Sequence, residues 1–384
     1  MTVQFGSSSA PQEPRAAVDD TQASTPVRSR LLRAQESPED ERLEQTIRPR
    51  ALDEYIGQSA LKETLRISLE AARGRNEPLE HTLFYGPPGL GKTTLAMALA
   101  HEMGAGILIT SAPALERPRD VIGLLMSLEP GQTLFIDEIH RLNKVAEEIL
   151  YPAMEDFMLD RTIGKGQATK ILRVPLPPFT LMGATTKAGS IAGPLRDRFG
   201  MAWRLQFYSP EELQQILTRS AGILGIALSP CGARAIALRA RGTPRIVNRL
   251  LRRVRDYAAV SRCDAIDKAC ADAALDLFEI DALGLDPTDR QLLSTMIQGF
   301  DGGPVGLETL AAALGEDART LEDVCEPYLL QAGLLHRTPR GRMATAAARR
   351  HLGFPPAQTP ESPLVTQTRL WANAHDGYGS DKDN

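Results

Sequence analysis

Lys92 and Thr93 close a glycine-rich segment whose residue types suit the binding of phosphate. The segment runs from Gly86 to Thr93 and fits the pattern G-x-x-x-x-G-K-[ST]. In such a loop the backbone N–H groups point inward at phosphate oxygens, the lysine neutralises the β- and γ-phosphates, and the hydroxyl binds Mg²⁺. An apolar run from Leu83 precedes the loop and an apolar-periodic helix follows it, as the pattern requires. The sequence therefore predicts a nucleoside triphosphate site rather than a chance Gly-Pro turn.

A pair of acidic residues, Asp137 and Glu138, ends an apolar run that begins at Thr133 in the stretch TLFIDEIHRL. At the carboxyl end of a buried strand, Asp137 would lie beside the phosphate loop and hold Mg²⁺ through water. Glu138 would polarise the attacking water, which is general-base work in phosphoryl transfer. The alternative is a strand that ends in polar residues because it reaches the surface. The preceding phosphate loop favours the catalytic interpretation.

Further segments carry side chains suited to a γ-phosphate. The run FTLMGATT ends in Thr185 and Thr186, either of which would reach the phosphate, although a Thr-capped turn is an equal alternative. GPLRDRFG holds Arg196 and Arg198, and such arginines are usually solvated. In a ring ATPase, however, one subunit donates an arginine to its neighbour's γ-phosphate, which is worth roughly 10³–10⁵ in rate. Arg245 lies in a first helical turn, where a cation is unfavourable unless an anion lies nearby.

The pattern of apolar residues predicts the elements that position these side chains. Strand-like and helical segments alternate up to about residue 207, which is typical of an α/β fold. The pattern is almost purely helical from about 210 to 283, and a smaller α+β unit follows to about 354. In the helical part, a buried stripe is predicted at Ile246, Val247, Leu250, Leu251 and Val254. A solvated basic face is predicted at Arg249, Arg252, Arg253 and Arg255.

Composition sets further limits on the class of protein. The chain has 384 residues and a net charge of −4, so a nucleic-acid surface must be a local patch. No apolar run approaches a membrane span, and the start of the chain does not resemble a secretory signal. Its 4 cysteines include no C-x-x-C pair, so we expect reduced thiols in a cytosol and no zinc. Residues 1–40 have the composition of a disordered tail.

Taken together and in order, the motifs resemble the RuvB family, the AAA+ motors that drive Holliday junction branch migration in bacteria. They are the phosphate loop, DEIH, GATT, PLRDRFG and GTPRIVNRLLRRVRD. The similarity extends over about residues 44–355 and includes LYPAMEDF, GGPVGL and RTPRGRMAT. A phosphate loop alone would indicate only an NTPase, whereas all of these motifs in order are specific.

The resemblance implies a fold and an assembly. The fold is an α/β AAA+ P-loop domain, a parallel sheet with flanking helices, followed by a helical lid and a C-terminal winged helix. The expected domains are 41–208, 209–282 and 283–355, and the tails at 1–40 and 356–384 are expected to be disordered. The implied assembly is a homohexameric ring on duplex DNA without sequence specificity, with RuvA on the four-way junction and RuvC in the resolving complex.

The same resemblance implies the chemistry and its setting. ATP and Mg²⁺ are the implied cofactors, and ATP hydrolysis would change the angle between the large domain and the lid. The setting would be recombination, DNA repair and the SOS response in the cytoplasm, at the nucleoid and not at a membrane.

By resemblance, roles pass to the residues already singled out. Lys92 and Thr93 match Walker A, within a loop that includes Gly89, Gly91 and Thr94. Asp137 and Glu138 match Walker B, with Thr93 and Asp137 as the metal-binding pair. Thr186, or its neighbour Thr185, matches sensor 1, Arg198 the arginine finger, and Arg245 sensor 2. The family's nucleotide pocket further implies Ile47, Arg48, Glu155, Asp156, Phe157 and Tyr208.

A hairpin is expected between Asp160 and Phe179, turning at Gly164-Lys165-Gly166. In the family this hairpin docks on RuvA, so its apolar side chains are candidate partner contacts. These are Ile163, Ile171, Leu172 and Val174. From the residues alone, a hairpin packed on its own domain is the favoured alternative.

The C-terminal segment LLHRTPRGRMATAAARRH resembles the wing of a winged helix. A TPRG turn would direct Arg337 and Arg342 at DNA phosphates, and phosphate contacts position a protein without reading sequence. Arg319 lies next to the family's usual basic contact, a position that Ala318 occupies here. Together with Arg340, Arg349 and Arg350, these arginines are dense enough to contact several phosphates. A solvated basic turn is the alternative.

The remaining alternatives concern function. Another AAA+ enzyme, such as a clamp loader, is disfavoured by the missing zinc-type cysteine cluster and by the winged helix. A winged-helix regulator that uses ATP only as a switch predicts slow hydrolysis and sequence-specific binding. Full activity in a Glu138→Gln variant would favour that regulator.

Overall fold

A parallel sheet forms the frame of the N-terminal half. The computed structural model describes residues 44–163 and 170–356, without the side chains of residues 161–171. The 5-stranded sheet has the order β2-β3-β6-β1-β7, and each neighbouring pair of strands is parallel. The strands are β1 (Thr82–Tyr85), β2 (Ile107–Ser111), β3 (Thr133–Asp137), β6 (Thr180–Thr185) and β7 (Met201–Arg204). Their carboxyl ends share one edge of the sheet, where ligands bind in open α/β folds.

Helices cover both faces of this sheet. They are α2 (Ser59–Arg75), α3 (Lys92–Glu102), α4 (Pro118–Met126), α5 (Lys144–Glu155) and the short α6 (Gly193–Arg196). Successive strand residues point to opposite faces, so Phe135 packs in the core with α2 and α3. Its neighbours Leu134 and Ile136 pack in the core with α4 and α5. The predicted α/β fold with flanking helices is therefore confirmed.

A helical unit follows the sheet. It contains α7 (Pro210–Leu224), α8 (Pro230–Leu238), α9 (Pro244–Ser261) and α10 (Lys268–Leu277). Ser209 caps the N-terminus of α7, and its side chain accepts from the backbone N–H of Glu212 in a capping box. Residues of this unit, such as Leu217 and Leu250, belong to the same buried cluster as the α2 and α3 face of the sheet. The lid is thus joined to the large domain by apolar packing.

The basic face predicted on α9 is partly wrong. The apolar stripe is confirmed at Val247, Leu250, Leu251 and Val254, which are buried, whereas Ile246 is half-buried against the same core. However, Arg249 is 8% exposed and Arg252 is 5% exposed, so neither is solvated. The Arg252 guanidinium lies 4.0 Å from the carboxylate of Glu44 in the N-terminal segment, a tertiary contact that helical spacing does not reveal.

A small C-terminal unit completes the described chain. Its elements are α11 (Pro287–Phe300), α12 (Leu307–Leu314), α13 (Ala318–Thr320), a π-helical turn at Leu321–Cys325, α14 (Glu326–Gln331), β8 (Leu335–Thr338), β9 (Gly341–Ala344) and α15 (Ala346–His351). The antiparallel β8–β9 pair forms the wing, and the unit has its own apolar core. The predicted winged helix is confirmed.

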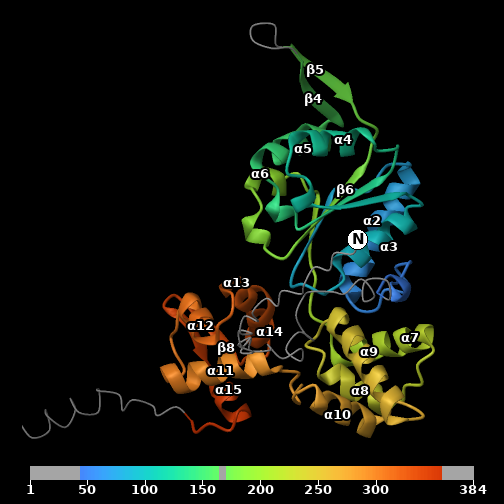
Figure 1. The fold of residues 1–384 in the computed structure, drawn as a ribbon. Helices are drawn as coiled ribbons and strands as arrows, with labels where there is room; N and C mark the ends of the chain where they lie inside the picture. The colour runs from blue at the N-terminus through green and yellow to red at the C-terminus, as the bar shows by residue number, and fades with distance from the viewer. Residues whose placement is uncertain (1–43, 164–169, 357–384) are drawn as a thin grey trace, which may run out of the picture.

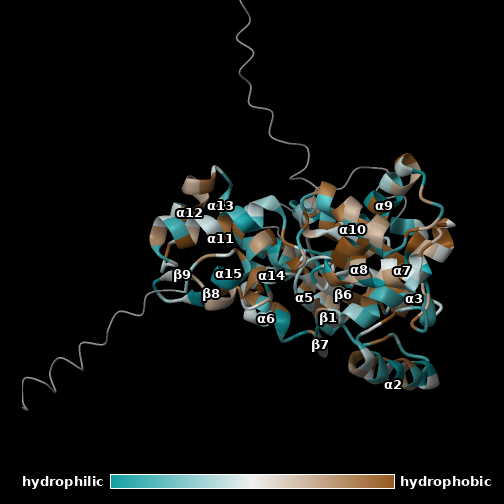
Figure 2. Cartoon of the chain, turned by 90° about the horizontal axis from the view of Figure 1, so that it is seen from below, coloured by the Kyte–Doolittle hydropathy of each residue, from teal (hydrophilic) through white to brown (hydrophobic). Residues whose placement is uncertain are grey.

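The hairpin of β4 (Met158–Ile163) and β5 (Lys170–Pro175) is antiparallel, as predicted. It projects away from the sheet, while the helical and winged-helix units lie side by side at the opposite end (Figure 1). Figure 2 shows these two units from below, with polar and apolar segments alternating along their helices. The predicted turn at Gly164-Lys165-Gly166 lies outside the described residues. Among the described helices, none has the length and apolar character needed to cross a membrane.

Candidate nucleotide site

The phosphate loop follows β1 and ends where α3 begins, at Lys92. Gly86 has φ of 140°, and a Cβ there would lie 2.9 Å from the Leu205 carbonyl oxygen. Gly91 has φ of 92°, and a Cβ there would lie 2.9 Å from the Tyr55 hydroxyl. A side chain at either position would combine backbone strain with a steric clash. The glycines are therefore required by the curl of this loop.

Lys92 is a buried cation at the centre of the loop. Its side chain is 8% exposed, and Nζ donates to the carbonyl oxygens of Gly86 and Pro87, both at 2.9 Å. Burial lowers the pKa of Lys92 to about 8, against the attraction of Asp137 and with a further lowering by Arg245. A cation that has only carbonyl oxygens as hydrogen-bond partners fits a site for an anionic phosphate.

Asp137 and Glu138 lie beside the loop, at the end of β3. Asp137 Oδ1 accepts from the backbone N–H of Glu138 at 2.8 Å. Glu138 has φ of 49°, a left-handed conformation that ends the strand abruptly, and such strain gathers at functional sites. The Glu138 carboxylate accepts from Arg141 at 2.7 Å. The general-base candidate is therefore paired with a neighbouring arginine in this conformation.

The threonines after β6 differ in their surroundings. Thr185 is 1% exposed, and its hydroxyl lies 2.9 Å from His140 Nδ1. It also accepts from the backbone N–H of Lys187 at 2.9 Å. Thr186 lines the pocket with Lys92. The geometry therefore favours Thr186 over Thr185 as the residue that faces the nucleotide.

The pocket closes on the lid side through the first turn of α9. The backbone N–H of Arg245 donates to the Gly89 carbonyl oxygen at 3.3 Å. The predicted residues that line the pocket are Ile47, Arg48, Gly89, Gly91, Lys92, Thr93, Thr94, Asp137, Glu138, Thr186, Tyr208 and Arg245. The cleft is thus built from the N-terminal segment, the sheet edge and the lid.

Sequence reasoning missed part of this pocket. The Tyr208 hydroxyl donates to the Tyr55 hydroxyl at 3.0 Å, and Tyr55 donates to the Leu90 carbonyl oxygen at 3.2 Å. Burial raises the pKa of Tyr208 to about 12, so this hydroxyl stays protonated. Pocket residues without a predicted role include Glu44, Glu54, Tyr55, Arg219 and Asn248. For Glu54 and Tyr55 the only signal in the sequence is proximity to Ile47 and Arg48.

Four predicted residues lie away from this pocket. Arg198 is 3.0 Å from the Glu155 carboxylate, lies 4.3 Å above the Tyr151 ring and donates to the Pro194 carbonyl oxygen at 2.6 Å. Asp156 ends α5, and Phe157 packs edge-on against the Phe179 ring at 5.8 Å. The structure does not bring Glu155, Asp156, Phe157 and Arg198 to the pocket of their own chain. A role at a neighbouring subunit's pocket stays a prediction.

Magnesium would have only a small set of protein ligands here. Within residues 44–163 and 170–356, no group of three or more His, Cys, Asp or Glu side chains is placed to hold a metal. Thr93 and Asp137 line the same pocket. This donor set fits Mg²⁺, which usually keeps waters and binds one or two protein oxygens together with substrate phosphates.

The wing arginines are paired within their own unit. Glu326 is 2% exposed and binds Arg342 at 2.5 Å as well as Arg337. Arg337 also lies 3.1 Å from Glu322, and half of its side chain is exposed. In this conformation the guanidinium groups of Arg337 and Arg342 are therefore paired with carboxylates rather than free to contact phosphate.

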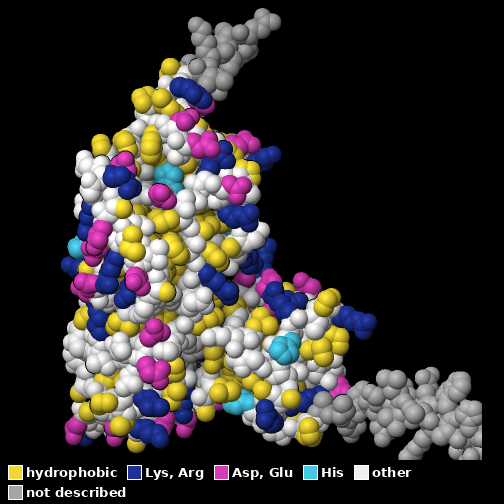
Figure 3. All heavy atoms as spheres, turned by 180° about the vertical axis from the view of Figure 1, so that it is seen from behind, with side chains coloured by type: hydrophobic (Ala, Val, Ile, Leu, Met, Phe, Trp, Pro, Cys, Tyr) yellow, Lys and Arg dark blue, Asp and Glu magenta, His cyan; other side chains and the backbone are white. Residues whose placement is uncertain are grey.

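The other basic residues of this unit fall into two groups. Arg319 and Arg340 are exposed. Arg349 is 7% exposed and binds Asp301 at 2.8 Å. The prediction that Arg349 contacts phosphate was wrong, because its guanidinium binds Asp301 and so joins α15 to the end of α11. Figure 3 shows basic and acidic side chains interspersed over one face, without a large field of one sign.

The hairpin offers apolar side chains away from the pocket. Leu172 is 49% exposed, and Val174 is half-buried against the core beside α5. The side chains of Ile163 and Ile171 lie outside the described set, although both residues belong to the paired strands. A partner surface at the hairpin stays a prediction.

Comparisons with known proteins agree with this architecture. A family model described as the Holliday junction DNA helicase RuvB P-loop domain matches residues 47–205. The models of the RuvB AAA lid domain and the RuvB C-terminal winged helix domain match residues 208–281 and 282–353. The chain belongs to the RuvB family.

Individual RuvB proteins are similar over most of their length. The chain is 62% identical over 329 residues to a Holliday junction branch migration complex subunit RuvB of Synechocystis sp., covering 86% of this chain and 90% of that protein. It is 58% identical over 340 residues to the subunit of Crocosphaera subtropica, covering 88% and 96%. A solved structure of the Thermotoga maritima RuvB Holliday junction branch migration motor has 48% identity and a TM-score of 0.74, covering 82% and 100%.

Proposed function

We propose how this chain works as the ATPase motor subunit of a Holliday junction branch migration complex. The observation that carries the proposal is the pocket itself. One cleft gathers the phosphate loop, both acids at the carboxyl end of β3, Thr186 and the lid residue Arg245, in a chain of the RuvB family. For its domains we propose the boundaries 41–208, 209–282 and 283–355.

ATP would lie across the pocket from the N-terminal segment to the sheet edge. Ile47, Arg48 and Tyr208 would surround the base, and Lys92 and Arg245 would hold the phosphates. Thr93 and Asp137 would hold Mg²⁺, which supplies charge neutralisation when bound. On phosphate binding, Lys92 would exchange its bonds to Gly86 and Pro87 for bonds to phosphate oxygens. That exchange explains why a lysine is kept in a buried loop.

Glu138 would orient and deprotonate the attacking water, and Thr186 would hold that water or the γ-phosphate. The carboxylate now accepts from Arg141 at 2.7 Å. Both side chains of this pair are about half exposed, with 45% for Glu138 and 56% for Arg141. An exposed pair of this kind is weak, so Glu138 is able to leave it when a nucleotide arrives.

Arg198 would complete the site of the neighbouring subunit in a homohexameric ring. The support is its position, because it lies on the α6 side with Glu155 and away from its own pocket. An arginine finger stabilises the charge that develops on the transferred phosphoryl group. Glu155, Asp156 and Phe157 would lie at the same interface.

The remaining parts would connect hydrolysis to the junction. The winged helix would hold duplex DNA through phosphate contacts of Arg319, Arg337 and Arg342, without reading sequence. The hairpin would dock on RuvA through Ile163, Ile171, Leu172 and Val174, and RuvC would join the resolving complex. We place this activity in DNA recombination and repair, within an SOS response, in the cytoplasm at the nucleoid.

A junction-dissociation assay tests the proposal. A labelled synthetic four-way junction is mixed with the full chain, the RuvA of the same organism, ATP and Mg²⁺, and released duplex arms are measured. Wild type and Arg196→Ala should release arms, whereas Glu138→Gln and Arg198→Ala should not. Arg196 is the matched control, because it is an exposed arginine only two residues earlier, at the end of α6. ATPase activity in wild type without any arm release would refute the motor assignment.

A further inference from the structure

The turn formed by residues 241–245 leads from the end of α8 into the start of α9, and it contacts the phosphate loop at one end. Arg245 donates its backbone N–H to Gly89 of that loop at 3.3 Å. Three residues earlier, the Gly242 carbonyl oxygen accepts from the backbone N–H of Tyr208 at 2.9 Å. A Cβ at Gly242 would lie 3.1 Å from Phe207, so the turn is closely packed on this segment. The turn that carries Arg245 is therefore fixed to the wall of the pocket.

Arg241, at the other end of the same turn, reaches into the winged-helix unit. Its Nε donates to the Gly284 carbonyl oxygen at 2.6 Å. One guanidinium nitrogen lies 2.6 Å from the Asp289 carboxylate and 3.4 Å from the Asp286 carboxylate. The Tyr328 ring lies 5.5 Å from the guanidinium. Since Asp286 and Asp289 form the capping box of α11, Arg241 holds the first helix of the winged-helix unit by its N-terminus.

This joint is buried and close-packed. Arg241 is 3% exposed and Asp289 is 0% exposed. Gly284 has φ of 75°, and a Cβ there would lie 2.3 Å from the Arg239 carbonyl oxygen, so the connecting segment lies directly on the end of α8. Burial raises the pKa of the Asp289 carboxyl, and the Arg241 guanidinium at 2.6 Å opposes that shift because it favours the charged carboxylate. Breaking a buried pair leaves an uncompensated charge, which resists separation of the two units.

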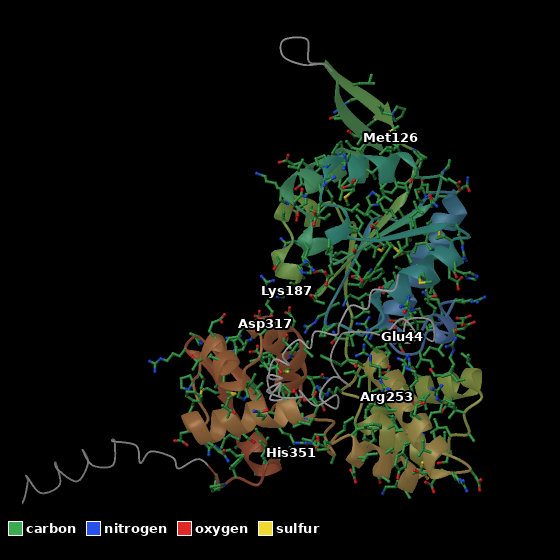
Figure 4. The ribbon with its side chains drawn as sticks, in the orientation of Figure 1. Glu44, Met126, Lys187, Arg253, Asp317 and His351 are labelled. Atoms are coloured by element: carbon green, nitrogen blue, oxygen red, sulfur yellow. The ribbon has the colours of Figure 1, made fainter. Side chains whose placement is uncertain are left out.

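A second contact to the winged helix is weaker. Lys187, which follows Thr186, lies 3.0 Å from Asp323 and 3.8 Å from Glu322. Figure 4 shows Lys187 at the edge of the large domain that faces the winged-helix unit. All three side chains are substantially exposed, and exposed pairs contribute little. This contact is therefore easily broken, whereas the Arg241 joint is not.

We propose that Arg241 is a positioning residue that couples the winged-helix unit to the turn at residues 241–245. When nucleotide binding displaces Arg245, this coupling moves the DNA-binding unit. Arg241 does not line the nucleotide pocket, and in this proposal it takes no part in hydrolysis. One end of this short turn contacts the phosphate loop and the other contacts the N-terminal cap of α11. Because the two ends are covalently connected, a displacement of the turn at the phosphate loop also displaces its contact with α11. The inference rests on the proposed function, because the motion it transmits is useful only to a DNA motor.

The first test measures coupling in the full chain with its RuvA. Arg241→Gln is compared with Arg239→Gln, which removes an arginine paired at 2.9 Å with Asp272 inside the lid. We expect Arg241→Gln to keep the DNA-free ATPase kcat and KM within about twofold and to lose at least tenfold in junctions dissociated per ATP hydrolysed. Arg239→Gln should keep both quantities. Arg241→Lys, which retains a charge for Asp289, should recover part of the ratio.

The second test measures the contact between Arg241 and the start of α11 directly, without a DNA junction. Hydrogen exchange at residues 284–290 is measured with and without a non-hydrolysable ATP analogue. Wild type should show nucleotide-dependent protection there, and Arg241→Gln and Asp289→Asn should show none while their DNA-free ATPase persists. If Arg241→Gln does not fold, the Asp289→Asn variant tests whether the contact between Arg241 and Asp289 transmits the effect of nucleotide.

The outcomes separate this inference from the proposed function. An unchanged coupling ratio in Arg241→Gln overturns the inference, and so does nucleotide-dependent protection that survives in both variants. A parallel loss of kcat, coupling and thermal stability also overturns it, since the residue would then serve stability alone. Failure of wild type to dissociate junctions refutes the motor assignment instead, and the exchange measurement still decides the role of Arg241.

Discussion

Lys92 should make ATP binding depend on pH above neutrality. In the nucleotide-free site, burial lowers the pKa of its amine to about 8. An anionic phosphate favours the protonated amine, so binding should return the pKa toward its ordinary value near 10.4. Lys92 is a base with a lowered pKa, which means that rising pH removes the charge that the phosphates require. ATP affinity should therefore be constant below pH 7 and fall as the pH passes 8.

The size of the effect follows from the protonated fraction of Lys92. With a pKa of about 8, the fraction is about 0.9 at pH 7 and about 0.09 at pH 9. If only the charged form binds, Kd should rise about tenfold between these values, or about 1.4 kcal/mol. Near pH 8, binding should take up about half a proton per site.

Titration calorimetry with a non-hydrolysable ATP analogue and Mg²⁺ checks both numbers. Kd is measured at pH 7, 8 and 9, and the proton uptake is obtained at pH 8 from two buffers with different heats of ionisation. Lys92→Arg is the matched control, because a guanidinium stays charged over this range and the dependence on pH should vanish. An unchanged Kd from pH 7 to 9 without proton uptake would show that Lys92 is charged throughout, and the reasoning from burial would fail.

Three further predictions concern the interface, the core and the wing. Mixing inactive Glu138→Gln and Arg198→Ala chains should restore ATPase activity, because about a quarter of the interfaces of a random ring pair an intact Glu138 with an intact Arg198; no recovery would argue against a finger in trans. Phe135→Ala should cost about 3–5 kcal/mol and lower the first thermal transition, whereas Ile109→Ala, at a side chain 50% exposed, should change it little; equal shifts would contradict the assigned core. Glu326→Gln should tighten duplex binding and steepen its salt dependence by about one to two units in the logarithmic slope, measured by fluorescence anisotropy beside the exposed control Glu308→Gln; an identical slope would mean that Arg337 and Arg342 contact no phosphate.

The sequence sufficed for much of the site because local rules determine it. The phosphate loop and Thr186 each follow a buried parallel strand, and Asp137 is the last residue of another. Parallel strands bring their carboxyl ends together. Helical spacing likewise placed the buried face of α9. These features depend on neighbours in the chain, so pattern and spacing were enough.

Other features depend on contacts between distant segments. Arg252 looked solvated from its spacing, but it packs towards Glu44 at the start of the described chain. The Arg342 pair with Glu326 joins the wing to a helix that precedes it, and no pattern in the wing marks that acid. Tyr55 reaches the pocket from an irregular segment that carries no motif. Such contacts arise only once the chain is folded.

The contacts of Arg198 bear on the order in which the nucleotide sites of the proposed ring would hydrolyse ATP. A free arginine side chain loses roughly 2 kcal/mol of rotamer entropy when it is fixed. Here Glu155, the Tyr151 ring and the Pro194 carbonyl already hold it within its own subunit. Arg198, the proposed arginine finger, is therefore held in a fixed position relative to its own subunit. The orientation of that subunit would determine whether its guanidinium reaches a neighbouring nucleotide. In the proposed ring, the tilt between neighbouring subunits would therefore determine which nucleotide Arg198 contacts next.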